Sequence, residues 1–327
     1  MNRFGQHFRI ALWGESHGPQ IGLVIDGVPA GIALSADDFT ADLARRRSGA
    51  RGTTPRREPD QPQLLAGIYR GCTTGAPLAI AFANTNTRSH DYAATEAGHD
   101  RPSHADWVAA VKYDGHNDPR GGGHFSGRLT LTLTAAGVVA KKMLPEGILF
   151  DTRIAEIGGC SDPARFDEVL QEAAACRDSV GGVVECRVQG VPAGWGEPFF
   201  DAVESVLAHL LFAIPGVKGV EFGSGFAAAR MRGSEHNDPI VDAAGCTATN
   251  HAGGIVGGIT NGNELVLRVA FKPTASIGRP QQTYNRATGR VEELAVAGRH
   301  DSCIALRGAV VVEAAAAIAL ADLMPRR

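Results

Sequence analysis

Histidine and aspartate residues in short, glycine-flanked motifs mark positions at which this chain could transfer protons. His17 lies in the segment 14–18, GESHG, and a histidine between flexible residues at a strand end can reach a cleft and titrate near neutrality. Asp301 ends the run GRHD, where a carboxylate beside a histidine is a candidate proton-transfer group. Read singly, a loop histidine such as His17 is more often structural, and Asp301 is equally compatible with a structural salt bridge.

Six arginines lie between residues 45 and 57, across a predicted helix end and a glycine- and threonine-rich loop. Their forked guanidinium groups suit phosphate and carboxylate oxygens. A solvated surface or a nucleic-acid patch is the alternative, but no aromatic residues are interleaved for base stacking. A small, multiply anionic ligand is therefore the better interpretation. The six residues are Arg45, Arg46, Arg47, Arg51, Arg56 and Arg57.

Glycine-rich segments offer further anion-binding chemistry. Segment 120–128, RGGGHFSGR, could present the backbone N–H groups of three successive glycines to a phosphate. Segments 250–258, NHAGGIVGG, and 272–276, KPTAS, add a lysine and more glycine backbone. No GxGxxG fingerprint or P-loop GK[ST] is present, so neither a dinucleotide-binding fold nor an NTPase is supported.

His104 lies in the segment 101–106, RPSHAD. Ser103 and Asp106 have the spacing of a capping box, which predicts a helix through Lys112 with His104 in its first turn. The positive end of the helix dipole disfavours an imidazolium there. An acid role for His104 therefore requires a neighbouring anion.

The elements that position these residues follow from hydrophobic periodicity and turn chemistry. Alternating and β-branched runs predict strands at 8–12, 21–25, 64–69, 78–82, 183–188, 217–222 and 264–271. Ser35 is a candidate cap for a helix that runs to about Arg47. Helical spacing predicts helices at 163–177 and 199–214, and an alanine-rich run predicts a closing helix at 309–323. Segment 129–134, LTLTLT, alternates like a strand, whereas the AAGVVAKKML that follows it is typical of a helix.

A sequence echo suggests an internal repeat. Residues 26–31, DGVPAG, and 189–194, QGVPAG, each follow a strand-like run and precede a helix-like run. Two halves sharing a βα unit about a pseudo-twofold axis would explain the echo, and a chance similarity of turns would explain it equally well.

Bulk composition limits the class of protein. The 327 residues are 44% hydrophobic with a formal net charge of −3, which argues against a polyanion-binding protein. No low-complexity linker divides the chain, so a single domain spanning 1–327 is expected. No apolar run reaches eighteen residues and no secretion signal is visible, so a membrane span is not expected. The six cysteines form no CxxC pair, which predicts free thiols in a reducing cytoplasm and no metal site.

Taken together, the motifs resemble the chorismate synthase family. In chain order they are GESHG followed by DGVP, RRR followed by RREPDQ, RP-x-HAD, GGG followed by S-x-R, NHAGGI-x-GG, KPT-x-S and GRHD. Each is weak alone, but seven in order from Gly14 to Asp301 make a specific match. The resemblance implies a lyase that converts 5-enolpyruvylshikimate-3-phosphate to chorismate and phosphate by anti-1,4-elimination, the last step of the shikimate pathway in aromatic amino acid biosynthesis.

The resemblance also implies cofactors and partners. The family requires reduced FMN although no net redox change occurs, with NADPH as an indirect reductant. This chain is short for the family and shows no added reductase segment, so an external flavin reductase is expected. A cytoplasmic homotetramer without a nucleic-acid partner is implied as well.

Catalytic roles are carried over to matching positions. The resemblance implies that His17 protonates the leaving phosphate and that Asp301 accepts a proton at flavin N5. It implies that a protonated His104 holds the N1/C2-oxygen edge of the anionic reduced flavin.

Binding roles are carried over in the same way. Arg46 and Arg51 match positions of NADP or phosphate contact, and Arg45 and Arg128 are candidates for binding substrate. The implied flavin cradle comprises His124, Phe125, Ser126, Gly257, Lys272, Pro273, Thr274, Ala275, Ser276 and Arg299.

The chain departs from common family patterns at a few positions. His124-Phe125 stands where Arg-Ser or Arg-Ala is common, which predicts a weaker charged contact with flavin. Ser103 replaces a frequent glycine, and Ala275 replaces a frequent serine. Pro215-Gly216 stands where a polar pair can touch flavin, so this pair is left out of the expected cradle.

The implied fold is α+β, a βαβα sandwich with antiparallel sheets in the core and helices outside. In that fold the segment 120–128 leads into a helix, so a helix is preferred for 129–134. The main rival interpretation is a non-catalytic protein that binds FMN or phosphoanions. A different phosphate-releasing lyase or mutase is a second rival.

Overall fold

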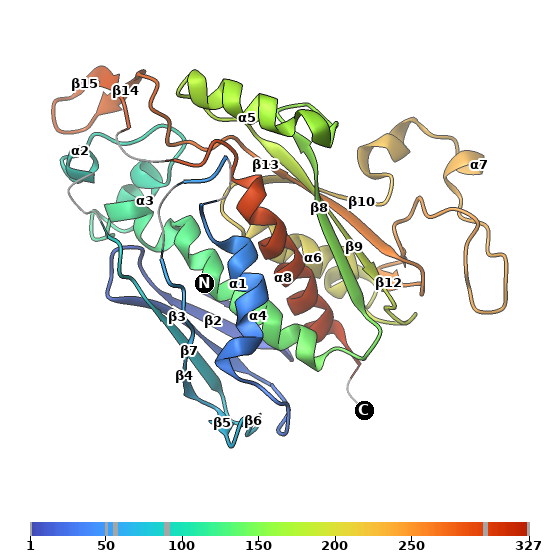
Figure 1. Ribbon diagram of the computed structural model, residues 1–327. Coiled ribbons are helices and arrows are strands. Elements are labelled where there is room, and N and C mark those ends of the chain that lie inside the picture. Colours follow the sequence, from blue (N-terminus) through green and yellow to red (C-terminus); the bar gives the residue numbers. More distant parts are fainter. Residues whose placement is uncertain (1, 50–51, 55–57, 88–91, 297–299, 326–327) are drawn as a thin grey trace.

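Two antiparallel sheets enclose a layer of long helices in the computed structural model, which describes all residues except 1, 50–51, 55–57, 88–91, 297–299 and 326–327 (Figure 1). The first sheet has the order β1-β2-β3-β7-β4. Its strands are β1 (Arg3–Phe4), β2 (Arg9–Gly14), β3 (Gln20–Asp26), β7 (Leu78–Ala83) and β4 (Gln63–Ala66).

The second sheet has the order β10-β13-β9-β8. Its strands are β10 (Val217–Phe222), β13 (Leu265–Phe271), β9 (Gly182–Gln189) and β8 (Leu149–Ile157). Three two-stranded hairpins complete the strands: β5 (Ile68–Tyr69) with β6 (Cys72–Thr73), β11 (Ile255–Val256) with β12 (Ile259–Thr260), and β14 (Gln281–Asn285) with β15 (Arg290–Leu294).

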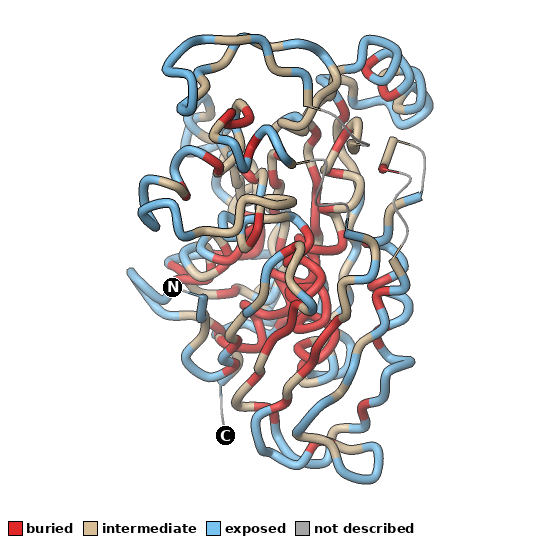
Figure 2. The backbone as a smooth tube through the Cα atoms, turned by 90° about the vertical axis from the view of Figure 1, so that its left-hand side faces the viewer, coloured by how far each residue is buried: buried red, intermediate tan, exposed pale blue. Residues whose placement is uncertain are grey.

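Helices α1 (Thr40–Arg46), α4 (Thr130–Met143), α6 (Val203–Phe212) and α8 (Ala305–Leu323) lie between the sheets, and α5 (Phe166–Ala175) lies outside the second sheet (Figure 1). The α+β class and the antiparallel sheets are confirmed. The helices were expected outside, yet the two longest, α4 and α8, are the most buried elements. Both are buried on every side along most of their length, so both sheets can pack against them. Figure 2 shows this buried centre as continuous red tube.

The remaining helices are short. They are α2 (Ala93–Glu96), α3 (Asp106–Lys112) and α7 (Gly233–His236), with 3-10 turns η1 (Ala36–Phe39), η3 (Arg120–Phe125), η4 (Gly127–Leu129), η5 (Pro163–Arg165), η6 (Phe199–Asp201) and η7 (Gly225–Arg230).

The predicted strands and long helices are confirmed, with shifted ends. The strand predicted at 64–69 is divided by Gly67, which has a positive φ of 83°. The final helix begins at Ala305 rather than at residue 309, so its first turn follows Asp301 closely in the chain.

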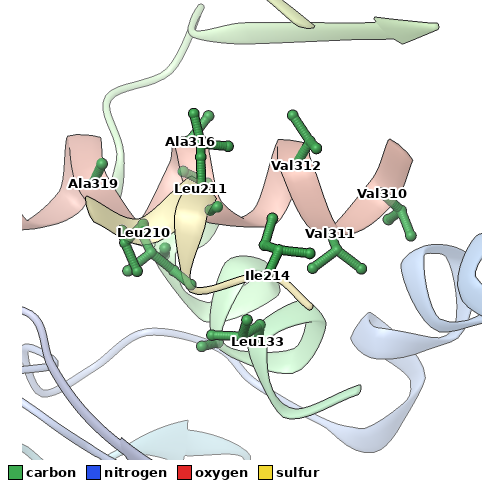
Figure 3. Close-up of a cluster of buried hydrophobic side chains, with 14 of the residues drawn as sticks. Leu133, Leu210, Leu211, Ile214, Val310, Val311, Val312, Ala316 and Ala319 are labelled. Atoms are coloured by element: carbon green, nitrogen blue, oxygen red, sulfur yellow. The ribbon is translucent and has the colours of Figure 1, made fainter. Parts of the chain in front are cut away.

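The central contact of the fold is the crossing of α4 and α8. A Cβ atom added to Gly137 would lie 2.4 Å from the Cβ of Ala314, so the two backbones approach as closely as a glycine permits. Around this crossing the side chains of three helices interdigitate (Figure 3). They include Leu133, Leu210, Leu211, Ile214, Val310, Val311, Val312, Ala316 and Ala319.

The alternating threonines of the segment LTLTLT are explained by helix α4. The Oγ1 atoms of Thr130, Thr132 and Thr134 donate to the carbonyl oxygens of Gly127, Leu129 and Thr130 at 2.7, 2.6 and 3.0 Å. A threonine that bonds back one turn leaves no unpaired hydroxyl, so it can face an apolar neighbour on any side. The helix preference for 129–134 is therefore confirmed, against its alternating pattern.

The internal repeat is confirmed by the topology. Each half runs through two paired strands, a VPAG turn, a helix, two more strands and a central helix, which gives the sheet orders β2-β3-β7-β4 and β8-β9-β13-β10. One threonine fixes each turn in the same way. Thr73 Oγ1 donates to the Pro29 carbonyl at 2.6 Å, and Thr260 Oγ1 donates to the Pro192 carbonyl at 2.7 Å. The echo at 26–31 and 189–194 is thus a structural repeat.

An arm interrupts the second half only. Strands β4 and β5 are separated by Gly67 alone, whereas residues 224–252 separate β10 from the Gly253-Gly254 pair before β11. Gly223 and Gly253 form a tight neck, since a Cβ on Gly223 would lie 2.6 Å from the nitrogen of Gly253. No residue of the arm is buried. The arm therefore contributes nothing to the core of this chain.

Buried charges join the helices beside the crossing. Glu313 of α8, whose side chain is only 5% exposed, pairs with Arg45 of α1 at 2.7 Å and with Lys141 of α4 at 2.5 Å. Burial alone would raise the pKa of Glu313, but Arg45 and Lys141 hold this pKa below its ordinary value. The interaction therefore stabilises the fold above the ordinary carboxyl pKa, and the stability is lost as pH falls through the lowered pKa.

We expect Glu313→Gln to lower the free energy of unfolding at neutral pH by about 1–3 kcal/mol, because two cations lose their shared carboxylate. Urea denaturation between pH 3 and 7 measures both this loss and a shallower acid dependence. The control is Glu168→Gln, which breaks an exposed pair with Arg165 and should change nothing measurable. Equal stability of the two variants would contradict the assignment.

Candidate active site

One cavity of about 960 Å³ opens where the two halves meet. Its walls are the C-terminal end of α1, the N-terminal turns of α4 and α8, and the segments that follow α6 and β13. These elements correspond to one another in the two repeats, so the cavity lies between equivalent parts of both halves. Its volume is near the upper end of the roughly 300–1,000 Å³ found for small-molecule sites, which leaves room for two ligands.

Most of the residues singled out in the sequence line this cavity. They come from five separate segments of the chain, which only the fold brings together. These residues are Arg46, His104, His124, Phe125, Ser126, Arg128, Lys272, Thr274, Ala275, Ser276 and Asp301.

Several predicted residues lie elsewhere. Gly257 is in the turn of the β11–β12 hairpin and Pro273 is not part of the wall. Arg45 also lies off the wall, because its guanidinium group forms two hydrogen bonds with Glu313. Arg51 and Arg299 lie outside the described residues, as do Arg56 and Arg57.

His17 lies directly behind the cavity wall. A Cβ atom on Gly121, which lines the cavity, would come within 2.6 Å of the His17 ring. The ring of His17 also packs edge-on against Tyr92, a second wall residue, with centroids 5.2 Å apart. The space for His17 exists because Gly121 has no side chain and takes a positive φ of 60°.

His104 does not lie in a helix, which corrects the capping-box prediction. Helix α3 begins at Asp106, and the Asp106 carboxylate accepts hydrogen bonds from the backbone and side chain of Arg101 instead of capping with Ser103. Ser103 has a left-handed φ of 59°, a conformation that favours the glycine frequent there in the family. Lys272 Nζ secures this turn by donating to the Ser103 carbonyl at 2.6 Å.

The His104 ring is held between two oxygen atoms. Its Nδ1 lies 3.0 Å from the Pro102 carbonyl, and its Nε2 lies 2.7 Å from Ser276 Oγ. Because a carbonyl can only accept, Nδ1 carries the proton and the Ser276 hydroxyl donates to Nε2. Burial, followed by repulsion from Arg101, lowers the pKa of His104 to about 4. Without a bound anion the ring is therefore neutral at pH 7.

Two buried arginines form the cavity floor. Arg128 pairs with Asp60 and, at 2.9 Å, with Glu58. Arg46 donates to Thr130 Oγ1 at 3.0 Å and to the Gly127 carbonyl at 2.8 Å, at the start of α4. Burial, followed by repulsion from Arg307, lowers the pKa of Arg46 to about 9. An anion bound here would relieve this repulsion.

Asp301 is the carboxylate of the cavity wall that lies just before α8. Its Oδ1 accepts from the backbone N–H of Thr54 at 2.7 Å, and its Oδ2 accepts from Arg307 Nη1 at 3.1 Å. Arg307 is a cavity residue that the sequence motifs did not reveal. The available signal was an arginine in the first turn of the last helix, six positions after Asp301.

Positive charge predominates in the described part of the wall. Six cationic side chains face three carboxylates there, in a chain whose formal net charge is −3. Such a local excess favours an anionic ligand. The cations are Arg46, Arg47, Arg101, Arg128, Lys272 and Arg307, and the carboxylates are Glu58, Asp60 and Asp301.

Comparison with known proteins relates this chain, with the cavity residues described above, to one family. A family model described as chorismate synthase matches residues 8–324. The chain belongs to the chorismate synthase family. It is 59% identical to the chorismate synthase of Chitinophaga pinensis, over 99% of this chain and 96% of that protein. It is 45% identical to the chorismate synthase of Dehalococcoides mccartyi, over 99% and 97% of the two chains.

The fold is shared with the family as well. A crystal structure of chorismate synthase superposes with a TM-score of 0.72 at 27% identity, covering 98% of this chain and 92% of that one. Among the described residues, no helix is long and apolar enough to cross a membrane. The same residues contain no cluster of three His, Cys, Asp or Glu side chains that could hold a metal ion.

We expect Gly121→Ala to displace His17 and to lower turnover in the chorismate synthase reaction by about 10²-fold, because a shift near 1 Å suffices for such a loss. Gly122→Ala is the matched control. It also has a positive φ, but its nearest neighbour would be Ser126 Cβ at 3.8 Å. Steady-state kinetics and the NMR signals of His17 measure the effect. Equal turnover of the two variants would show that the position of His17 is unimportant.

Proposed function

We propose that this protein is a lyase that converts 5-enolpyruvylshikimate-3-phosphate to chorismate and phosphate, with reduced FMN bound beside the substrate. The observation that carries the proposal is the single cavity in which His104, Asp301 and the floor arginines meet, with His17 directly behind its wall. Family membership across nearly the whole chain supports the same reaction.

The electrostatics of the cavity fit this substrate. It carries two carboxylates and a phosphate, and the phosphate alone contributes about −1.5 to −2 charges at pH 7. Arg46 and Arg128 on the floor and Arg101 beside His104 supply guanidinium groups suited to these oxygens. Arg51, which lies outside the described residues, is a further candidate contact for NADP or phosphate, as is Arg46.

The wall also fits a flavin. The hydroxyl Oγ1 of Thr274 is buried without a hydrogen-bond partner among the described residues, so it is available to a ligand in the cavity. FMN would be held by His104, Lys272, Ser276 and the segment 124–126, and Arg299 would add a charged contact. When bound in its reduced form, FMN would supply the electron density that the departure of the phosphate requires.

The chain's own residues then manage protons. His17 would donate a proton to the oxygen of the leaving phosphate, and Asp301 would accept a proton at the N5 position of a bound flavin. Asp301 is suited to this role because its two oxygens are already oriented by Thr54 and Arg307. His104 gains a proton when an anion binds at its Nε2 edge, which reverses the donor direction of its hydrogen bond with Ser276.

The partners are proposed on the same family basis. An external reductase supplies reduced flavin with NADPH as the indirect reductant, and the enzyme acts in the cytoplasm as a homotetramer. Exposed aromatic side chains support self-association, since Phe199 and Phe200 are 84% and 93% exposed. Gly257 and Pro273 remain proposed flavin contacts that this single chain does not bring to the cavity wall.

We expect the protein, with dithionite-reduced FMN and substrate under anaerobic conditions, to release phosphate and chorismate in equal amounts. His17→Ala and Asp301→Ala should still bind FMN while turnover falls by about 10²-fold or more, because each loses a proton-transfer group. Phosphate release and chorismate absorbance are measured together. A folded, flavin-loaded protein that forms neither product would instead be a non-catalytic FMN or phosphoanion binder.

We expect His104 to remain neutral from pH 5.5 to 8 in the ligand-free protein, because its pKa is about 4. The reduced isoalloxazine of FMN is anionic, so its binding should raise the pKa of His104 and the imidazole should take up a proton near pH 7. Oxidised FMN should leave the ring neutral, since its isoalloxazine carries no charge. NMR titration of the imidazole signals follows both states, and a ring that titrates near 6.5 without ligand would contradict the assigned geometry.

A further inference from the structure

Arg307 is a cavity cation that, within the described part of the chain, forms an ion pair with the proposed base. It lies in the first turn of α8, and its Nη1 donates to Asp301 Oδ2 at 3.1 Å. Both side chains are largely buried, with 24% and 13% of their surfaces exposed. The pair is therefore shielded from solvent more than a surface ion pair, which strengthens its electrostatic effect.

Arg307 is itself held in place. Its Nε donates to the carbonyl oxygen of Arg46, the last residue of α1, at 3.0 Å. Arg46 in turn is bonded to the first turn of α4 through Thr130 and Gly127. The guanidinium group is thus braced between the ends of three helices, so it presents Nη1 to Asp301 from a defined direction.

Asp301 is fixed from its other side by the loop that follows α1. Oδ1 accepts from the N–H of Thr54, and the neighbouring Ser302 N–H donates to the Gly52 carbonyl at 2.9 Å. Each carboxylate oxygen uses one acceptor position in these contacts and keeps another. The carboxylate is oriented without being saturated, which leaves an oxygen able to accept a proton.

We infer that Arg307 is the positioning residue for Asp301 in the proposed reaction, an inference that rests on the proposed function. Arg307 donates to Oδ2 of Asp301 and the Thr54 N–H donates to Oδ1, so the two contacts together fix the orientation of the carboxylate in the cavity wall. Arginine is suited to this because it keeps its own proton, so the pair does not collapse into two neutral groups. Arg307 acts through Asp301 and does not itself exchange a proton with the ligands.

The test compares Arg307→Gln and Arg307→Lys in the full-length enzyme with reduced FMN. For Arg307→Gln we expect kcat to fall by about 10²-fold with KM and the FMN Kd within about threefold, because only the proton-transfer step is impaired. Arg307→Lys keeps the charge and should recover about tenfold of the lost kcat.

A double-mutant cycle separates positioning from an independent role. On an Asp301→Asn background, Arg307→Gln should have little further effect on kcat, because the residue through which it acts is already disabled. The matched control is Arg153→Gln, which breaks the ion pair with Glu185 outside the cavity. It should leave kcat within about threefold.

Other outcomes overturn the inference. A raised KM with unchanged kcat would make Arg307 a substrate ligand, and additive losses in the cycle would give it a role independent of Asp301. Loss of FMN binding in both Arg307 variants would make it part of the flavin site. A wild-type enzyme that forms no chorismate would refute the proposed function itself, whereas an active wild type with an equally active Arg307→Gln variant refutes only the role of Arg307.

Discussion

The close crossing of α4 and α8 is the constraint on which the site depends. Gly137 and Ala314 let the two backbones touch, and the first turns of both helices thereby reach the same cavity. Arg128 approaches this cavity from η4, just before α4, and Arg307 from the first turn of α8. A bulkier contact at the crossing would separate the helices, and with them the two arginines. The packing of the core therefore also determines the distance between the charged groups of the site.

Gathering arginines in a buried floor carries an electrostatic cost. The lowered pKa of Arg46 expresses this cost, which arises from burial and from its cationic neighbours. Asp60 offsets part of it, and hydrogen bonds to the start of α4 satisfy the guanidinium donors. A floor organised in this way favours an anion strongly, because the polar groups are oriented before the ligand arrives.

Much of this architecture could be predicted from the sequence because it is local. The strands, the VPAG echo and the motif order all follow from short segments. Which charged side chains pair with one another does not. Arg45 and Arg46 are adjacent, yet one faces Glu313 and the other the cavity, since successive helical residues point about 100° apart. Asp106 had the spacing of a helix cap but pairs with Arg101. Arg307 pairs with Asp301 but lies outside the GRHD motif and every other motif of the sequence. Partners of these kinds are chosen by the tertiary fold.

The glycine neck at the base of the arm has a consequence for how the family can vary. Gly223 and Gly253 bring the arm's two ends together, and Gly223 N–H and Gly253 C=O both bond to Val266 of β13. A segment that departs and returns at one point can be shortened, lengthened or exchanged while the strand register beneath it stays fixed. The first repeat, which closes the same junction with Gly67 alone, shows the minimal form of this attachment point. The two repeats can thus differ at the edges of their sheets while their central helices continue to pack in one common core.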